Sequence, residues 1–326
     1  MLGTQFYFSN GNLKNKGEFF YVYCNQPFFG NLSQHFFKFD DTYYIEDNSF
    51  KHATYNIIDK YNKNEFIIPE NPNTLNLTNV FIITTGKCLN AGHAYGNIMN
   101  SIFKFFKNNE NINDYSIVVT DEILFSKFLT SLIYLFFDKE KIFLLNDKTT
   151  LKFEKCVYYI DYSFRCIEHD NFLIDLLIKK KENEPKNLSL ENVCMIKTNQ
   201  SYSHYNARYF DENYNEYIKS KGFNIIRPED FDFLELFNIL YNAKNVILSW
   251  GCCAYLNSTF LNENVNYLCL GHISYAHEYN GFAYNVPDHL WKPLKYNKCI
   301  FCMDLPSDLN EETIKELDAK LDELVN

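Results

Sequence analysis

The pattern of apolar and polar positions changes near residue 78. Residues 1 to about 77 carry short aromatic or alternating apolar runs, such as "EFFYVYC" and "HFFKFDDTYYIED", which are broken by Asn, Gly and Pro. Apolar residues that alternate with polar ones between turn residues are typical of strands. We therefore expect short strands and loops in this part of the chain.

From residue 78 onward, near-continuous apolar runs alternate with longer segments that favour helices. Up to residue 183 this pattern predicts strands at 79–86, 115–121, 141–147 and 155–161 and helices at 94–108, 122–138 and 170–183. After residue 192 it predicts strands at 193–199, 223–229, 245–250 and 265–271 and helices at 211–222, 232–243 and 254–261. Such alternation indicates parallel sheets with helices on both faces.

Residues 179–192, "KKKENEPKNLSLEN", have charge, a proline and no apolar periodicity, and are the best candidate for a linker. An ordinary surface loop is the alternative. A chain of 326 residues also exceeds what one hydrophobic core usually organises. We therefore expect two α/β domains, 1–185 and 186–326. The last segment, 308–325, predicts an amphipathic helix that packs back onto them.

Composition and charge exclude some classes of protein. Hydrophobic residues make up 46% of the chain and aromatic residues 18%, which excludes general disorder. The excess of Phe, Tyr, Asn, Lys and Ile is typical of an AT-rich genome, so each such residue carries less functional weight. The formal net charge of −10 argues against a broad basic face for nucleic acid.

Neither a signal peptide nor about 18 uninterrupted apolar residues occurs in the sequence, so we expect no membrane span. The ten cysteines are scattered, which favours reduced thiols. Cys299 and Cys302 form a lone C-x-x-C that favours buried thiols over zinc. We expect a cytoplasmic protein, a virus-encoded protein in a host cytoplasm included, and no metal cofactor.

The turn that follows the strand at 245–249 is the first candidate site. It reads "SWGCCA", with Ser249 as a hydroxyl donor, Gly251 for close backbone approach, and the amides of Cys252 and Cys253 at a helix start. Ligands of open α/β sheets lie beyond the carboxyl ends of the strands. A phosphate or diphosphate is the ligand that suits this turn. Because no G-x-G-x-x-G follows a strand and no P-loop motif occurs, a nicotinamide or P-loop interpretation is disfavoured.

The region from 222 to 261 resembles the C-terminal core of glycosyltransferase family 61, the DUF563 type. The matching positions are Gly222, Phe223, Pro228, Glu229, Glu235, Ala243, Gly251 and Asn257. The upstream stretch "NAGHAYGN" is similar to the Asn-x-x-His helix start of the same family, with Asn90 and His93 in register. The resemblance covers roughly residues 80 to 270 in layout, and these two stretches carry it.

This resemblance implies a GT-B architecture, in which two Rossmann-like domains face a cleft. It also implies inverting, metal-independent transfer of a sugar from a nucleotide-diphosphate donor, by default a UDP-sugar, to a hydroxyl of a glycan or protein. The implied partners are this donor and a glycan or glycoprotein acceptor. Whether the protein forms a homodimer is left open. Such an enzyme must stabilise the departing diphosphate and needs a general base for the acceptor.

Catalytic candidates are His93, Asn97 and Glu278, and the general base stays unassigned. His93 is placed by the resemblance at the start of a helix, and an imidazole can transfer a proton near neutral pH. Asn97 stands where the family often has an acidic residue, and a carboxamide cannot act as a base. Glu278 lies in the loop after the strand at 265–271.

Candidates for the donor site surround the same turn. Lys197 and Arg208 are the cations available to neutralise phosphate, and Trp250 replaces the family histidine before Gly251. Glu235 is placed where donor ribose hydroxyls are held in this architecture. Asn257 completes the family match, with helix packing as its alternative role.

Two other interpretations remain open. The replacements at Asn97 and Trp250 favour a catalytically inactive protein that binds carbohydrate or nucleotide on the same fold. A different nucleotide-dependent transferase, such as a pyruvyl-transfer enzyme, is the third possibility.

Overall fold

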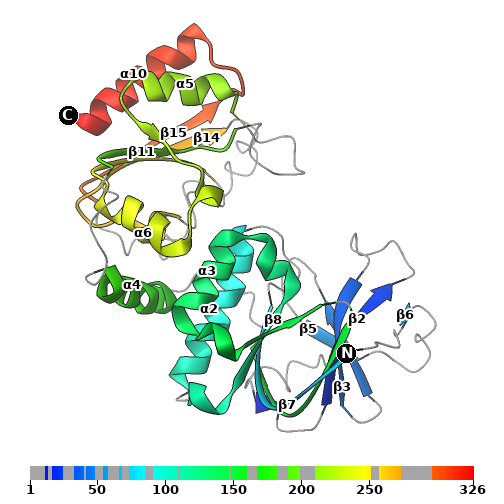
Figure 1. Ribbon diagram of the computed structural model, residues 1–326. Helices are drawn as coiled ribbons and strands as arrows, with labels where there is room; N and C mark the ends of the chain where they lie inside the picture. Colours follow the sequence, from blue (N-terminus) through cyan, green and yellow to red (C-terminus); the bar gives the residue numbers. More distant parts are fainter. Residues whose placement is uncertain are drawn as a thin grey trace. The chain divides into compact units, whose positions relative to one another are not determined.

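The computed structural model forms two compact units, 1–164 and 165–326 (Figure 1). It describes residues 12–13, 17–24, 33–39, 42–47, 54–57, 66–67, 73–84, 91–108, 111–146, 148–159, 167–181, 190–198, 210–250, 257–272 and 296–326. Helix α4 (Ile167–Lys181) packs against helix α6 (Phe233–Asn242) of the second unit. The division therefore comes earlier than the boundary expected after residue 185, and residues 179–181 of the expected linker are helical.

Within its described residues, the first unit contains one mixed sheet, two α-helices and short 3-10 turns. Its strands are β1 (Asn12–Leu13), β2 (Gly17–Cys24), β3 (Ser33–Phe39), β4 (Thr42–Asp47), β5 (Thr54–Ile57), β6 (Phe66–Ile67), β7 (Asn73–Ile83), β8 (Ser116–Thr120), β9 (Ile142–Leu145) and β10 (Thr149–Tyr158). Its helices are α2 (Ala91–Lys107) and α3 (Lys127–Phe136), with 3-10 turns η3 (Ile112–Asp114), η4 (Asp121–Phe125) and η5 (Lys139–Lys141).

The aromatic N-terminal strands belong to the same sheet as the parallel strands. The strand order is β5-β4-β3-β2-β10-β7-β8-β9, with β1 paired to β10 and β6 paired to β2. Strands β10, β7, β8 and β9 are parallel, whereas β2 runs antiparallel to β10 and continues into an antiparallel meander. The expected β-rich preface is therefore an extension of the parallel sheet.

Strand β7 is buried on both faces at its carboxyl half. Phe81 points to one face, where its ring stacks on Phe105 of α2 with centroids 4.3 Å apart. Val80 and Ile82 point to the other face and pack with residues of β8 and β10. Burial on both faces explains why this strand reads as a continuous apolar run.

Two predictions for the first unit differ from the structure. The helix expected at 122–138 is divided, because Ser126 ends η4 and caps α3 by accepting a hydrogen bond from the Leu129 N–H at 3.2 Å. The strand expected at 155–161 is β10, which begins six residues earlier at Thr149 and so follows β9 closely, with no room for a helix between them. The strict strand–helix alternation of a Rossmann-like domain therefore does not extend through this unit.

The second unit contains a five-stranded parallel sheet. Its strands are β11 (Asn192–Met195), β12 (Asn224–Ile225), β13 (Asn245–Ser249), β14 (Asn266–His272) and β15 (Lys298–Leu305). Besides α4 and α6, the described helices of this unit are α5 (Glu212–Ser220) and α10 (Glu311–Val325), with 3-10 turns η6 (Pro228–Asp230) and η7 (Ser258–Phe260). The order β12-β11-β13-β14-β15 is that of doubly wound flavodoxin-like sheets. The predicted α/β class with parallel sheets is confirmed.

Helices cover both faces of this sheet (Figure 1). Helices α5 and α10 lie on one face, where Leu317, Leu321 and Leu324 of α10 share a buried cluster with Ile247 and Leu268 of the strands. Helix α6 lies on the other face. The final helix begins after Asn310, whose side chain accepts a hydrogen bond from the Thr313 N–H at 2.9 Å. This predicted helix is therefore confirmed, and it packs on β14 and β15 of its own unit.

Strand β15 contains the C-x-x-C pair and was not predicted as a strand. Side chains alternate along it, so Cys302 is buried against α10 whereas Cys299 belongs to the opposite face and is exposed. Two thiols on opposite faces of one strand cannot bind the same zinc ion. The expectation that both cysteines are buried is correct only for Cys302.

Gly222 ends helix α5 in a left-handed conformation with φ of 88°. Its N–H donates to the Lys219 carbonyl at 3.0 Å, and the Phe223 N–H donates to the Ile218 carbonyl at 3.4 Å. This is a Schellman motif, and Phe223 and Ile218 also pack together in the core. Gly222 and Phe223, which carry part of the family resemblance, thus have a folding role.

Replacing Gly222 with alanine is expected to destabilise the second unit by about 1 kcal/mol, because an L side chain in this conformation is strained. No neighbouring atom lies within 4 Å of an added Cβ, so the strain comes from the backbone alone. Urea unfolding followed by tryptophan fluorescence measures the effect. Gly222→Asn should cost less, because Asn tolerates the left-handed region; equal stability of all three proteins would contradict the explanation.

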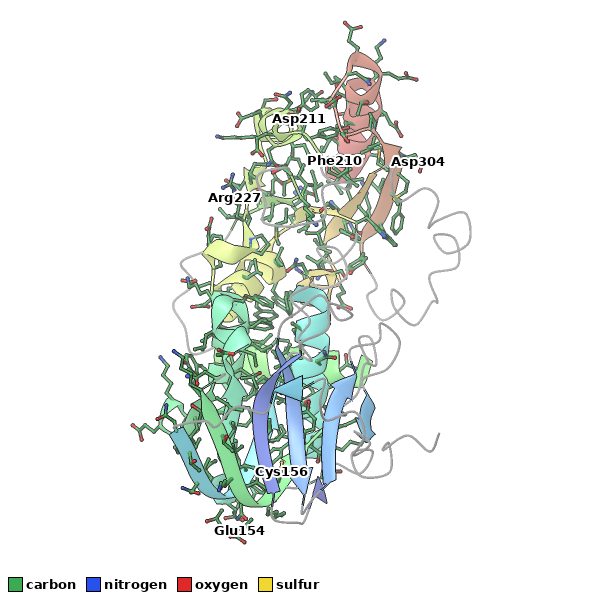
Figure 2. The ribbon with its side chains drawn as sticks, turned by 90° about the vertical axis from the view of Figure 1, so that its right-hand side faces the viewer. Glu154, Cys156, Phe210, Asp211, Arg227 and Asp304 are labelled. Atoms are coloured by element: carbon green, nitrogen blue, oxygen red, sulfur yellow. The ribbon has the colours of Figure 1, made fainter. Side chains whose placement is uncertain are left out.

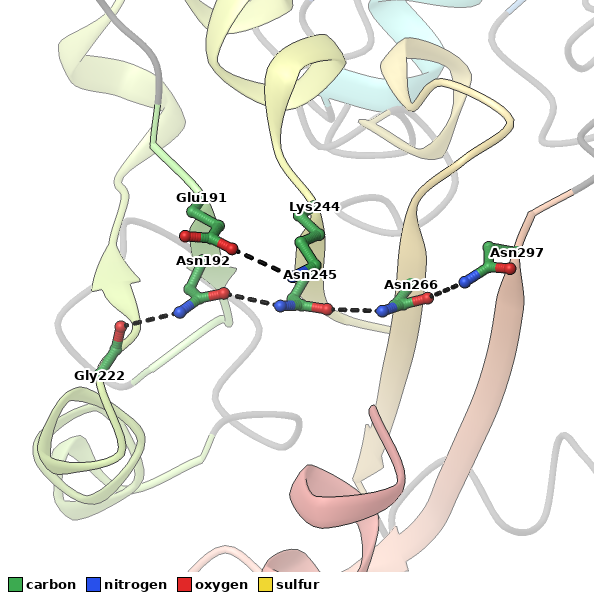
Figure 3. A network of polar contacts seen from close by, with 7 residues as sticks. All are labelled: Glu191, Asn192, Gly222, Lys244, Asn245, Asn266 and Asn297. Carbon is green, nitrogen blue, oxygen red and sulfur yellow. Dashed lines mark hydrogen bonds and ion pairs between the residues drawn. The ribbon is translucent and has the colours of Figure 1, made fainter. Parts of the chain in front are cut away.

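A row of asparagine side chains connects the amino ends of the parallel strands (Figure 3). Asn297 donates to Asn266 at 2.7 Å, Asn266 to Asn245 at 2.8 Å, and Asn245 to Asn192 at 2.7 Å. Asn192 donates to the Gly222 carbonyl at 3.4 Å. A carboxamide both donates and accepts, so identical side chains extend such a chain from strand to strand. This asparagine row fixes one edge of the sheet.

Candidate functional site

The strand order of the second unit marks where a ligand is expected. The chain leaves β11 toward β12 on one side and returns through β13 toward β14 and β15 on the other. In open α/β sheets, ligands bind outside the carboxyl ends of the strands at such a change of direction. This point lies between the carboxyl ends of β11 and β13, opposite the edge that carries the asparagine row.

A hydrogen bond closes the sheet between these two strand ends. The Ser249 hydroxyl, which is buried, accepts a hydrogen bond from the Lys197 N–H at 3.0 Å. Thr198 then forms a parallel bridge with Phe210, whose N–H donates to the Lys197 carbonyl at 3.1 Å. The backbone of Lys197 is thus fixed on both sides. Ser249, expected to donate to a ligand, has its oxygen engaged as an acceptor in the sheet.

Four residues form a row across this edge, one on or just beyond each of four neighbouring strands. Extending the β11–β13 register from Met195 and Leu248 places Lys197 beside Trp250. The Trp250 N–H donates to the Leu270 carbonyl at 2.7 Å, which places Gly271 next to it. Because side chains alternate along strands, Lys197 and Trp250 belong to the face opposite the α5–α10 cluster.

A β-bulge places the fourth member of the row. Leu270 pairs with Cys302 and His272 with Leu305, so Met303 and Asp304 both oppose Gly271. Asp304 accommodates the extra residue with φ of 66°. A Cβ at position 271 would overlap the end of the Met303 side chain, so the thioether occupies the space above the glycine.

Helix α6 begins at the same edge, because it follows η6 and leads into the amino end of β13. Its first turn is a capping box: the Glu235 N–H donates to the Asp232 carboxylate at 2.8 Å, and the Asp232 N–H donates to the Glu235 carboxylate at 2.9 Å. Both carboxylates thus satisfy backbone groups of the helix. The ribose contact expected for Glu235 would compete with this structural role.

Arg227 is a cation at this edge that sequence analysis did not identify. It lies two residues after the end of β12, its side chain is half exposed, and its guanidinium lies 4.0 Å from the Glu212 carboxylate. Figure 2 shows Arg227 and Asp304 on opposite sides of the second unit, near the outer strands β12 and β15. The sequence signal that could have identified Arg227 was its position just after an apolar strand, which it shares with Lys197.

Glu212 and Asn215 on the first turns of α5 form a second polar feature near Arg227. The Asn215 amide donates to the Glu212 carboxylate at 2.9 Å. The second Glu212 oxygen and the Asn215 oxygen are buried, and none of the described residues donates a hydrogen bond to either. Buried acceptors of this kind are normally satisfied by a donor such as water.

In the first unit, the backbone places His93 in the first turn of α2 and the partly buried Asn97 in the second turn of that helix.

A polar pair that was not predicted from the sequence lies at the carboxyl ends of β7 and β10. The buried hydroxyls of Thr84 and Tyr158 form a hydrogen bond of 3.1 Å across these strands. Ser101 of α2 also donates to the Tyr159 carbonyl at 3.2 Å.

Several predicted site residues lie outside the described residues, namely Arg208, Gly251, Cys252, Cys253 and Glu278. Asn257 is buried just before η7, consistent with a packing role. Of the expected helix at 254–261, the described part is helical at Asn257 and continues as the 3-10 turn η7 over Ser258–Phe260.

The thiols of β15 are poorly suited to nucleophilic chemistry. Burial, and the nearby Glu316 carboxylate, raise the pKa of Cys302 to about 12. Partial burial of the sulfur raises the pKa of Cys299 to about 11, although the residue as a whole is exposed. Both thiols are therefore protonated near neutral pH, and the thiolate is the reactive form.

No protein-family model matches this sequence, and no curated protein matches it significantly. In the part of the chain that the structure describes, no helix combines the length and apolar character required to cross a bilayer. Nor does that part contain a group of three His, Cys, Asp or Glu side chains placed to hold a metal ion.

Proposed function

We propose that the protein is an inverting, metal-independent glycosyltransferase of GT-B type that transfers a sugar from a nucleotide-diphosphate donor, by default a UDP-sugar. In this proposal the second unit binds the donor and the first unit the hydroxyl of a glycan or protein acceptor. The observation that carries it is the doubly wound strand order of the second unit, with Lys197 and Trp250 at its change of direction. The resemblance of residues 222–261 to glycosyltransferase family 61 supports the same assignment.

The chemistry of this edge suits a diphosphate. Lys197 supplies a positive charge on a backbone held by two hydrogen bonds, and α6 directs its N-terminus to the same edge. Helix N-termini present backbone N–H groups and a partial positive charge to anions. Stabilising the departing diphosphate is the main electrostatic requirement of such a transfer.

The first unit offers His93 as the candidate base. The imidazole would accept the proton of the acceptor hydroxyl as its oxygen attacks the anomeric carbon of the sugar. The bond from that carbon to the donor phosphate breaks, and the electron pair leaves with the nucleotide diphosphate. Attack from the face opposite the leaving group inverts the anomeric centre.

A non-catalytic protein that binds nucleotide or carbohydrate is the second candidate. Two observations favour it: Asn97 has a carboxamide where a base would be expected, and the Glu235 carboxylate is used in the capping box of α6. A panel of nucleotide sugars with glycan acceptors separates the candidates. Release of nucleotide supports the enzyme, whereas binding without turnover for every donor supports the second candidate.

Replacing Lys197 with methionine is expected to weaken UDP binding by about 10- to 100-fold, because a hydrogen bond to a charged group contributes about 1.5–3 kcal/mol. Isothermal titration calorimetry measures the affinity. Lys219→Met is the matched control, since Lys219 is exposed in the last turn of α5, away from the carboxyl ends of the strands. Equal UDP affinity in both variants and the unchanged protein would contradict the proposed donor site.

A further inference from the structure

We propose that the indole of Trp250 stacks on the nucleobase of the bound nucleotide while Lys197 neutralises its phosphate. This inference rests on the proposed function and assigns the two ends of the donor to particular strands. It depends on the row formed by Lys197, Trp250, Gly271 and Met303 on one face of the sheet. The row gives the site a polar end and an aromatic end.

The polar and aromatic ends lie at a spacing that suits a nucleotide. Neighbouring strands are about 4.8 Å apart, so about 10 Å separates the strand of Lys197 from that of Gly271. Trp250 follows the strand between them, and its indole lies next to the Phe301 ring of β15. A nucleotide carries its phosphate and its flat base on opposite sides of one ribose, which is a length of the same order.

The aromatic end of the row is apolar because of the residues on β14 and β15 next to Trp250. Gly271 has no side chain, and the Met303 thioether lies above its backbone. Phe301, 44% exposed, places its ring centroid 6.5 Å from that of Trp250 with a 59° angle between the planes. The bulge at Met303 and Asp304 sets this arrangement by opposing two residues to Gly271.

The side chains in this row favour a nucleobase over a sugar as the stacked group. The indole N–H of Trp250 is the one hydrogen-bond donor among the side chains of Trp250, Phe301 and Met303, and Gly271 has no side chain. Sugar hydroxyls placed over them would lose hydrogen bonds to water without replacement. Every nucleobase presents a flat π-face, so any of them can stack on an aromatic ring. The transferred sugar is thus assigned to the other side of Lys197.

The test uses the full chain with Trp291→Phe, which leaves Trp250 as the only tryptophan, because the sequence contains two. UDP and inorganic pyrophosphate are titrated separately, with tryptophan fluorescence and calorimetry as readouts. We expect UDP to quench the indole emission and pyrophosphate to bind without comparable quenching. Trp250→Ala should weaken UDP binding by about 5- to 100-fold and leave pyrophosphate binding unchanged, whereas Trp250→Phe should retain most of the affinity.

The possible failures are distinguishable. UDP binding that depends on Lys197 but neither quenches Trp250 nor weakens in Trp250→Ala overturns the stacking inference and leaves the proposed function standing. Equal losses for UDP and pyrophosphate in Trp250→Ala, with an unchanged melting temperature, also overturn it, because stacking affects the base alone. If no ligand binds to the unsubstituted protein or to the Trp291→Phe protein, the proposed function falls as well.

Discussion

Asn245→Leu is expected to lower the free energy of unfolding of the second unit by about 2–4 kcal/mol. Asn245 sits in the middle of the asparagine row and is buried. Leucine has a similar volume but removes one donor and one acceptor. The Asn192 oxygen and the buried Asn266 amide group each lose a partner, and an unsatisfied buried polar group costs about 1–3 kcal/mol.

Urea unfolding followed by tryptophan fluorescence measures this change, because Trp250 and Trp291 both belong to the second unit. Asn297→Leu is the matched control. Asn297 forms the exposed end of the same row, where water can replace the hydrogen bond that its side chain donates to the Asn266 oxygen, so its loss should cost about 1 kcal/mol. Similar small losses in both variants would show that the row contributes little to stability.

Phe81→Ala is expected to destabilise the first unit by about 3–5 kcal/mol, the usual cost of emptying a buried phenylalanine site. The Phe81 side chain has no solvent exposure. Its ring stacks on Phe105 and meets Phe137 and Tyr159 edge-on, with centroids 6.0 and 6.2 Å away. These neighbours come from separate elements, so the cavity could close only if α2 shifted toward the sheet.

Hydrogen exchange followed by mass spectrometry suits this variant, because the tryptophans do not report on the first unit. Peptides from β7 and β8 should exchange faster in Phe81→Ala, while those of the second unit keep their protection. Leu124→Ala is the control, since Leu124 is exposed on η4 and its loss should stay within about 0.5 kcal/mol. Unchanged exchange in β7 would contradict the importance of this aromatic cluster.

The strands that are buried on both faces were predictable because their apolar runs are continuous, as in Val80–Ile83 and Ile117–Val119. Strand pairing was not predictable. The contact of β2 with β10 joins residues more than a hundred positions apart, and neither strand carries a local sign of its partner. Strand β15 was missed because its alternating residues were interpreted as a cysteine motif.

The asparagine row has a pattern in the sequence, namely asparagines at the starts of strands, to which sequence analysis gave no weight. Asn192, Asn245, Asn266 and Asn297 each stand at or directly before the start of an apolar strand, and Asn224 does the same on β12. The high asparagine content of the chain made each of them look incidental. Only the shared register of the parallel strands shows that they meet.

For the candidate site, sequence analysis placed its residues at the carboxyl ends of the strands of the second sheet but did not predict the contacts among them. Lys197, Ser249 and Trp250 do lie at the carboxyl ends of their strands. The engagement of Ser249 by a neighbouring strand and the overlap of Gly271 with Met303 depend on long-range register. Such contacts have no local pattern from which they could be inferred.

The mixed sheet of the first unit limits how the chain can be divided for expression. Strand β10 has β7 on one side and β2 on the other, so a fragment that starts at β7 would expose an open edge with unpaired N–H and C=O groups. Such an edge promotes association with other chains. Residues 165–326, in contrast, contain a complete sheet with its own helices and are the natural choice for producing a separate half of the protein.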